Sequence, residues 1–213
     1  EVKYILQQID DSLLRDHLYL EANDKCYFYG EYAGRQGYAF SETNQLIFNF
    51  KKPMKARNKP DWQYKIKAIE TISQILPASK GWAKLRQYTW VPIPPSKDRN
   101  DPEYDDRLLQ VLLKLKETEQ CLDVREILLA QKSRNAAHAP DNQVRPTIKD
   151  HISNLVVDKA LLTPAPKAIA VFDDVLTTGA SFKAAQYILR KAFPSIPIIG
   201  IFVARNINLI DDI

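Results

Sequence analysis

The clearest pattern in the chain begins near residue 87, where segments rich in apolar and β-branched residues alternate with amphipathic segments. In the amphipathic segments apolar residues recur every three or four positions, which is the spacing of a helix with one buried face. Strands that alternate with helices indicate a mainly parallel sheet covered by helices on both faces. We therefore predict an α/β core with strands at 87–94, 124–131, 151–158, 167–174 and 197–206 and helices at 105–120 and 181–193.

The N-terminal third shows a different pattern. Apolar residues at helical spacing predict helices over 2–20 and 62–76. Between them, aromatic and β-favouring residues at 25–33 and 36–52, with glycines near the turns, predict an antiparallel hairpin or meander. The inward face of the second helix would consist of Ile66, Ile69, Ile72, Ile75 and Leu76.

The chain of 213 residues thus divides into an N-terminal α+β hood subdomain, residues 1–80, and a core, residues 81–213. Inside the core, residues 132–150 are almost entirely polar, contain two prolines and show no periodicity. A loop of that length inside a compact domain is usually functional or mobile.

Charge and composition set limits on the partners. The chain has 30 Lys and Arg against 26 Asp and Glu, a net charge of +4. This balance suits an anionic small ligand, whereas a nucleic-acid site would need the positive charge gathered on one face. The basic run at residues 51–59 has no interleaved aromatic residues and is more typical of a solvated face, so nucleic acid is not the expected partner.

The two cysteines, Cys26 and Cys121, stand far apart and form no CxxC pair, so a zinc site is not expected. The sequence has no disulfide framework and no signal peptide, which makes the cytoplasm the expected compartment. No apolar run approaches the length that crosses a bilayer, so no membrane partner is expected.

Two adjacent carboxylates, Asp173 and Asp174, end the apolar run at 168–172, and a hydroxyl-rich turn follows before the next predicted helix. Free N–H groups and the helix dipole favour a phosphate at such a turn. The carboxylates cannot bind that anion, but they suit sugar hydroxyls or a hydrated Mg²⁺. The segment therefore predicts a site for a phosphorylated ribose. The alternative is that Thr177 and Ser181 only cap the helix, whose N-terminus the acids favour.

The segment VFDDVLTTGAS, residues 171–181, resembles the phosphoribosyl pyrophosphate (PRPP) motif of type I phosphoribosyltransferases. The resemblance implies a type I phosphoribosyltransferase-like fold that binds PRPP or a ribose 5-phosphate compound. It implies that Asp173 and Asp174 hold the ribose 2- and 3-hydroxyls and the cofactor Mg²⁺, directly or through water. The 5-phosphate would be wrapped by Thr177, Thr178, Gly179, Ala180 and Ser181.

Two further segments are similar to parts of this family. Residues 88–101 stand where the family binds pyrophosphate, which implies that Ser96, Lys97 and Arg99 hold that group; the alternative is a solvated loop. Residues 132–149 stand where the family has a flexible flap that closes over the site. There the resemblance implies that Lys132 and Arg134 are catalytic cations, and the alternative is a plain disordered excursion.

The order of these segments is similar to ComF-type members of the superfamily. The resemblance departs at 101–110, where the glycine of an Arg-Gly pair is missing, and the zinc-binding cysteines of many ComF-like N-termini are absent. Within that stretch, Tyr104–Arg107 is interpreted either as charge that stabilises a helix N-terminus or as support for Mg²⁺ or pyrophosphate.

The resemblance implies an Mg²⁺-dependent phosphoribosyltransferase that transfers the 5-phosphoribosyl group of PRPP to a nitrogen acceptor and releases pyrophosphate. Purine-salvage members carry an aspartate base where this chain has Thr177, so the nucleophile needs no strong base or another residue supplies one. The alternative is a non-catalytic PRPP- or nucleotide-binding regulatory or partner-binding module of the same fold. The acceptor, the pathway and a homodimer stay open.

Overall fold

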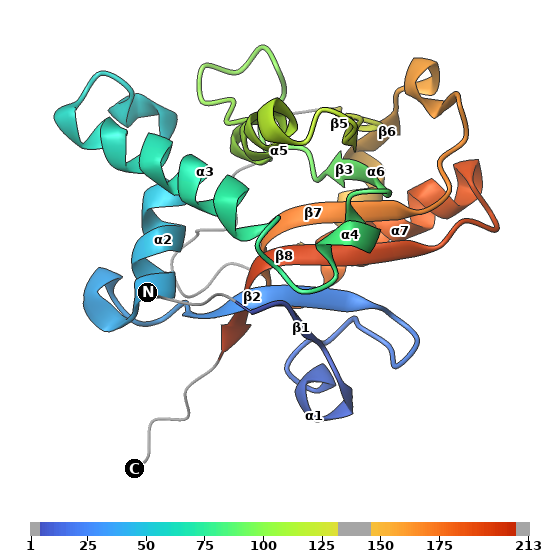
Figure 1. Ribbon diagram of the computed structural model, residues 1–213, viewed down its shortest axis with the longest axis horizontal. Coiled ribbons are helices and arrows are strands. Elements are labelled where there is room, and N and C mark those ends of the chain that lie inside the picture. Colours follow the sequence, from blue (N-terminus) through green and yellow to red (C-terminus); the bar gives the residue numbers. More distant parts are fainter. Residues whose placement is uncertain (1–4, 132–145, 208–213) are drawn as a thin grey trace.

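The computed structural model describes residues 5–131 and 146–207, which form a six-stranded sheet with helices on both faces and a small two-stranded sheet (Figure 1). The strand order in the large sheet is β1-β2-β8-β7-β3-β4, and only β1 pairs antiparallel with its neighbour. The prediction of an α/β fold with a mainly parallel sheet flanked by helices is confirmed.

The strands are β1 (Gln7–Gln8), β2 (Cys26–Ala33), β3 (Thr89–Pro92), β4 (Asp123–Val124), β5 (Leu128–Ala130), β6 (Leu155–Val157), β7 (Ile169–Leu176) and β8 (Ile198–Ile207). The α-helices are α1 (Asp11–Leu14), α2 (Glu42–Phe50), α3 (Gln63–Ile75), α4 (Trp82–Leu85), α5 (Arg107–Thr118), α6 (Ile148–Asn154) and α7 (Ala180–Ala192). Short 3₁₀ helices are η1 (Tyr38–Phe40), η2 (Met54–Ala56), η3 (Pro60–Trp62) and η4 (Lys159–Leu162).

The centre of the sheet is formed by β7 and β8, whose sequences are apolar over most of their length. A strand that is covered on both faces needs apolar side chains on both, which explains the continuous runs. In β7 only Asp173 is partly exposed, and all its other residues are buried. The carboxyl ends of β2, β3, β7 and β8 lie at one edge of the sheet because these strands run parallel.

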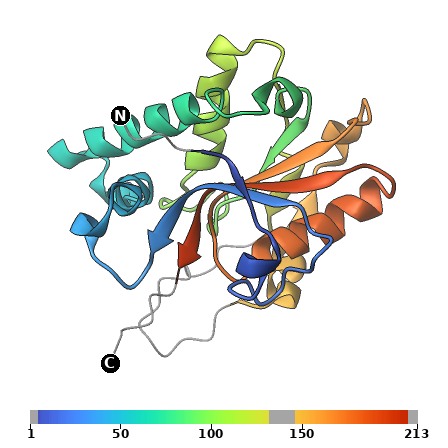
Figure 2. The same ribbon diagram turned by 60° about the horizontal axis from the view of Figure 1, so that its bottom comes forward.

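The two faces of the sheet have different cover (Figure 2). On one face α2, α3 and α5 pack their apolar sides, with residues such as Ile72 and Leu112, against Phe172 and its neighbours. On the other face α7 packs Phe182 against Val171 and the adjoining strands. Over Ile169–Phe172, alternate residues of β7 therefore point to different helices.

Two N-terminal segments differ from their predicted structure. The helix predicted over 2–20 is wrong for the described part: the side chain of Asp10 accepts two backbone N–H groups and starts only the four-residue α1. The strand predicted within 36–52 is also wrong, because the chain forms α2 there, capped by Ser41. Burial at helical spacing overrides the β preference of the aromatic residues. The buried residues of α2 are Asn44, Leu46, Ile47 and Phe50.

Two segments of the core are corrected as well. The strand predicted at 124–131 is divided between β4 in the large sheet and β5, which pairs with β6. The strand predicted at 151–158 begins as the end of α6 and becomes extended only in β6. Thr147 and Asp150 form a capping box that starts α6, so the described end of the predicted loop at 132–150 is helical. The predictions that became α3, β3, α5, β7, α7 and β8 are confirmed.

The strand β2 links the N-terminal third to the core. It pairs with β8 from Cys26 opposite Gly200 to Ala33 opposite Ile207, so the hairpin predicted for 25–33 is replaced by a parallel pairing. The helices α2 and α3 cover the same sheet. The division of the chain at residue 80 into a hood and a core stays a prediction.

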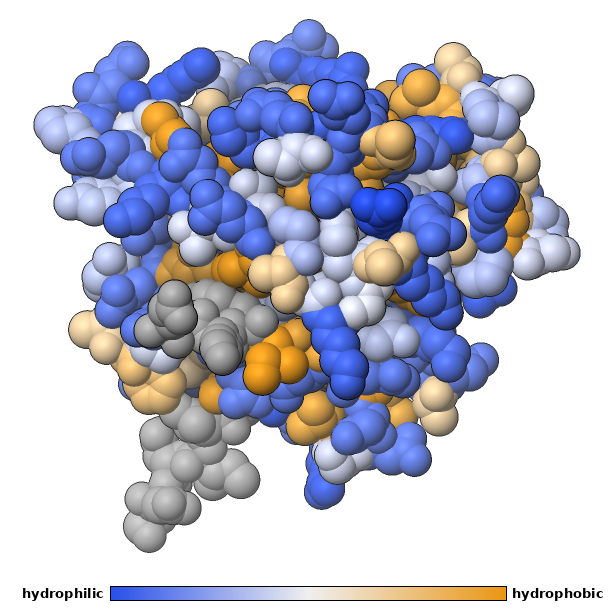
Figure 3. Space-filling view, viewed as in Figure 1, coloured by the Kyte–Doolittle hydropathy of each residue, from blue (hydrophilic) through white to orange (hydrophobic). Residues whose placement is uncertain are grey.

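The surface is mostly polar on the face shown in Figure 3, where hydrophilic residues surround separate apolar patches. Among the described residues, no helix combines the length and the apolar character needed to cross a membrane.

The first prediction tests the contact between β2, β8 and α7 at Gly200. A Cβ atom there would lie 2.7 Å from Phe202 Cε2 and 3.0 Å from both Cys26 Sγ and Phe182 Cδ2. Gly200→Ala should therefore lower the free energy of unfolding by about 1–3 kcal/mol, the usual cost of overpacking a core. Urea denaturation measures it. The control is Gly37→Ala, which meets nothing within 4 Å and should change little; equal effects of the two substitutions would contradict the packing.

Candidate functional site

The carboxyl ends of the parallel strands open into a pocket of about 610 Å³. This is the edge at which sheets of this kind bind ligands. Three groups of lining residues come from the loop after β3, the start of α5 and the β7–α7 turn, and a fourth comes from the ends of β2 and α2. The lining residues include Lys51, Ser96, Lys97, Asp105, Arg107, Asp173, Asp174, Thr177, Thr178, Ala180 and Ser181.

The two aspartates of β7 differ in their partners and in their burial. Asp174 contacts Lys51 at the end of α2 and Arg107 at the start of α5, so it lies on the side of the sheet that these helices cover. Both line the pocket, but only Asp173 is partly exposed, whereas Asp174 is 6% exposed. The two carboxylates are adjacent in the sequence, but their surroundings differ.

Asp174 is held by two cations and by the backbone. Its Oδ2 accepts from Arg107 Nη2 at 2.5 Å and from Nε at 3.2 Å, and its Oδ1 lies 3.1 Å from Lys51 Nζ. The N–H of Val175 also donates to Oδ1 at 2.6 Å. Burial alone would raise the pKa of Asp174, but Lys51 and Arg107 outweigh it and hold the pKa well below its usual range. Both of its oxygens are thus engaged and charged.

The charge of Asp174 also changes the pKa of its neighbour Asp173. Burial and the negative charge of Asp174 raise the pKa of Asp173 to about 7, while the N–H of Asp174 donates to its Oδ1 at 2.8 Å. Within the described residues no lysine or arginine nitrogen lies at ion-pair distance from it. Asp173 is therefore the carboxylate that a ligand in the pocket would meet.

A chain of ion pairs continues behind Arg107. Its Nη1 lies 2.8 Å from Asp105 Oδ2, and the same oxygen lies 2.7 Å from Lys65 Nζ. Lys65, which is 1% exposed, also donates to the carbonyl oxygens of Phe50 at 3.0 Å and Lys52 at 2.9 Å. Burial lowers the pKa of Lys65, and Asp105 opposes that shift. These contacts tie α3, α5 and the end of α2 to the end of β7.

Apart from Asp174, the sequence indicates only the segment Tyr104–Arg107 of this network. Asp105 and Arg107 form ion pairs with each other, with Lys65 and with Asp174, so their charges do not serve only to stabilise the N-terminus of α5. Lys51 and Lys65 were missed. A signal existed for Lys65, because it falls in the buried stripe of α3 where an apolar residue is expected, while Ile66, predicted to face inward, is 49% exposed.

The turn between β7 and α7 forms one wall of the pocket, where Thr177, Thr178, Ala180 and Ser181 lie. Gly179 begins α7 at φ +86°, a left-handed conformation that favours glycine. A Cβ atom on it would also lie 2.8 Å from Leu20 Cδ2, so the close approach here is to Leu20. At this end of α7 the N–H of Ala180 donates to Thr178 Oγ1 at 3.4 Å, and no such bond to Thr177 or Ser181 is present among the described residues, which leaves their interpretation as helix caps without support.

The predicted pyrophosphate residues separate. Ser96 and Lys97 line the pocket, and Lys97 Nζ lies 3.5 Å from Asp101 Oδ2, a long and exchangeable pair. Arg99 does not line it and instead pairs with Glu126 at 2.9 Å, with its side chain 58% exposed. The structure therefore brings two of the three predicted residues to the pocket. The predicted catalytic cations Lys132 and Arg134 lie outside the described residues.

One prediction concerns the buried pair Lys65–Asp105. Asp105→Asn removes the only carboxylate that the structure gives Lys65 among the described residues, and weakens the hold on Arg107. Leaving a buried cation uncompensated costs about 3–5 kcal/mol, so urea denaturation should show a large loss of stability. Arg86→Gln, which breaks the exposed pair with Glu119, is the control and should cost less than about 1 kcal/mol. A comparable loss in both variants would contradict the network's importance.

Another prediction follows from the raised pKa of Asp173. Between its ordinary pKa of 3.8 and about 7, the folded protein keeps a proton that the unfolded chain has released. This group therefore stabilises the fold fully below 3.8, and the stabilisation is lost as the pH rises through about 7. The lowered pKa of Asp174 makes the stability depend on pH only below pH 3.8, so it does not contribute in this range.

Asp173→Asn imitates the protonated carboxyl and removes this dependence. The difference in unfolding free energy between Asp173→Asn and the unaltered protein should be small near pH 4 and should grow in favour of the variant up to about pH 8. Denaturation curves across this range measure the difference. A difference that does not change with pH would show that Asp173 titrates normally.

Comparison of the chain with protein-family models finds no match, and comparison with the curated proteins finds none either. The resemblance of residues 171–181 to the PRPP motif therefore depends on the residues of that segment. To these the structure adds a pocket, lined by all the predicted ligand-binding residues of the segment except Gly179, and the partners described above.

Proposed function

We propose that the pocket binds PRPP or a related ribose 5-phosphate and that the chain has a type I phosphoribosyltransferase-like fold. The single observation that supports this best is the meeting of the β7–α7 turn and Asp173 in one pocket at the carboxyl ends of parallel strands. An anion at the start of α7 and a hydroxyl-bearing sugar beside Asp173 would be adjacent there, as they are in a phosphorylated ribose.

In the proposed complex the 5-phosphate lies against the N–H groups at the start of α7, and Thr177, Thr178 and Ser181 add hydroxyl donors. The ribose hydroxyls donate to Asp173, the less restrained of the two carboxylates. Asp174 would accept from a hydroxyl only after exchange with Lys51 or Arg107, since both of its oxygens are engaged. The pair therefore divides its work, and Asp174 mainly holds the surrounding cations in place.

Mg²⁺ fits this pocket with limited help from the protein. The described residues contain no cluster of three or more carboxylate, histidine or cysteine side chains that would enclose a metal ion. Asp173 offers one carboxylate, and Mg²⁺ commonly uses one or two carboxylates together with substrate phosphates and water. Asp173 would hold the ion, which would supply charge neutralisation to the pyrophosphate group.

The proposed reaction joins a nitrogen atom of the acceptor to C1 of the ribose while the bond from C1 to the pyrophosphate oxygen breaks. The pyrophosphate leaves with the bonding electrons, and the acceptor nitrogen releases its proton to water. Lys97, which lines the pocket, would neutralise the leaving group, and Thr177 offers no base. Lys132 and Arg134 stay the predicted cations of the flap.

A non-catalytic binding module is the second candidate, and one observation favours it. Asp174 is locked between Lys51 and Arg107, and a carboxylate so engaged does not need a ligand to be satisfied. A protein that senses PRPP or a nucleotide would gain stability from this arrangement without requiring turnover.

The proposal predicts that isothermal titration calorimetry with PRPP and Mg²⁺ shows binding by the unaltered protein and weaker binding by Asp173→Asn. Losing a charge-assisted hydrogen bond should reduce the binding free energy by about 1.5–3 kcal/mol. Asp61→Asn is the matched control, because Asp61 pairs with Lys52 and does not line the pocket. Unchanged affinity in a folded Asp173→Asn variant would contradict the assignment.

The two candidates differ in turnover. Pyrophosphate release in a screen of nitrogenous bases and amines, with PRPP and Mg²⁺ present, would establish a transferase. Binding without release from any acceptor would favour the non-catalytic module.

A further inference from the structure

The β7–α7 turn is held from behind by an N-terminal segment, residues 17–24. His17 is 1% exposed, and its Nδ1 lies 2.5 Å from the carbonyl oxygen of Thr177. The backbone N–H of Tyr19 donates to the next carbonyl, that of Thr178, at 2.9 Å. Two successive carbonyls of the turn are thus fixed by residues about 160 positions earlier in the chain.

This contact decides which way the N–H groups of the turn point. In a trans peptide the carbonyl and the following N–H belong to one plane and point in opposite directions. Because the carbonyls of Thr177 and Thr178 point toward residues 17–19, the N–H groups of Thr178 and Gly179 point away from them. Successive N–H groups that point to one side form an anion-binding concavity. No acceptor for these two N–H groups is present among the described residues.

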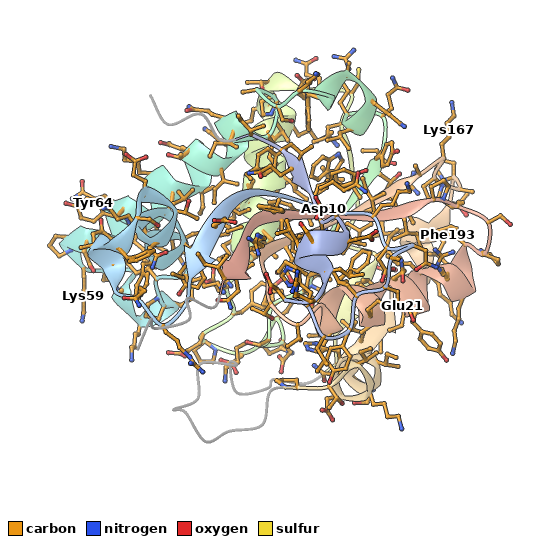
Figure 4. The ribbon with its side chains drawn as sticks, turned by 90° about the horizontal axis from the view of Figure 1, so that it is seen from below. Asp10, Glu21, Lys59, Tyr64, Lys167 and Phe193 are labelled. Carbon is orange, nitrogen blue, oxygen red and sulfur yellow. The ribbon has the colours of Figure 1, made fainter. Side chains whose placement is uncertain are left out.

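The rest of the segment secures the same turn and the first turns of α7. The side chain of Leu20 occupies the place that a Cβ on Gly179 would take. Lys183 pairs with Glu21 and with Asp24, each at 2.9 Å, and Asp24 also accepts from Gln186 at 3.0 Å. Figure 4 shows Glu21 beside α7, close to the short helix α1.

The buried position of His17 leaves one polar atom unpaired, and a packing role alone does not explain why a histidine stands there. A carbonyl can only accept, so the ring proton must lie on Nδ1, and burial lowers the pKa of His17 and keeps the ring neutral. The other nitrogen, Nε2, is then a buried acceptor without a partner among the described residues. An unpaired buried acceptor destabilises the fold, and a leucine of similar size would avoid it.

We propose that His17 is a positioning residue for the anion-binding turn. By donating to the Thr177 carbonyl it orients the N–H group of Thr178, a residue that lines the pocket, so that this N–H binds the phosphate of the ligand. The N–H group of Gly179 is oriented in the same direction by Tyr19, through the Thr178 carbonyl. The inference rests on the proposed function, since it assigns His17 a part in binding the same 5-phosphate. His17 itself does not line the pocket.

The test compares His17→Asn with His17→Leu. The amide nitrogen of asparagine stands near the position of Nδ1 and can donate to the carbonyl, whereas leucine fills similar space without a donor. The probe is ribose 5-phosphate, with affinity measured by calorimetry and the amide shifts of Thr178 and Gly179 followed by NMR. We expect His17→Asn to bind within about threefold of the unaltered protein and His17→Leu to bind about tenfold more weakly or worse.

The outcomes separate the two proposals. If the unaltered protein does not bind ribose 5-phosphate, the proposed function fails. If it binds and His17→Leu binds equally well, or His17→Asn loses as much as His17→Leu, only the role of His17 fails. Should His17→Leu not fold, nitrogen NMR of the unaltered protein decides: a ring proton on Nδ1 supports the role, and one on Nε2 overturns it.

Discussion

The ion pair between Arg107 and Asp174 is the interaction on which the arrangement of the pocket depends. Asp174 lies next to a second carboxylate at the end of a buried strand, and without a cation it would have to take up a proton. Arg107 is the first residue of α5, so this contact also fixes that helix against the end of β7. Burial alone would lower the pKa of Arg107, but Asp174 and Asp105 outweigh it and raise the pKa above its ordinary value. The consequence is unequal chemistry in the pair: Asp174 stays charged and engaged, and Asp173 is left to titrate and to meet a ligand.

Residues from the N-terminal third of the chain support both the end of β7 and the turn that follows it. On one face Lys51 and Lys65, at the end of α2 and in α3, extend the ion-pair network of Asp174. On the other face residues 17–24 hold the turn and α7 by hydrogen bonds and ion pairs. The N-terminal third therefore does more than cover the sheet, because it sets the orientation of the groups that we propose bind the ligand. This division between a binding turn and distant supports is common where rigid geometry is needed.

The sequence predicts those parts of the molecule whose structure is decided locally. The apolar run of β7 and the helical spacing of α7 identify both elements. The acids at the end of β7 and the turn between β7 and α7 identify one wall of the pocket. The strand expected within 36–52 fails because its aromatic residues favour β structure while their burial follows a helix. His17 and Lys51 could not be found from the sequence, because only tertiary packing brings them to residues more than a hundred positions away. Arg99 shows the opposite error: its charge suits a phosphate, but Glu126 is the nearer partner.

The most direct measurement of the central claim is the structure of a crystal soaked with ribose 5-phosphate. We expect the phosphate at the β7–α7 turn, within hydrogen-bond distance of the N–H groups of Thr178 and Gly179, and the ribose hydroxyls on Asp173. We also expect Arg107 to keep its contact with Asp174. A phosphate bound elsewhere in the molecule, or a pocket that stays without ligand while the same soak shows binding at another surface, would contradict the proposed binding site.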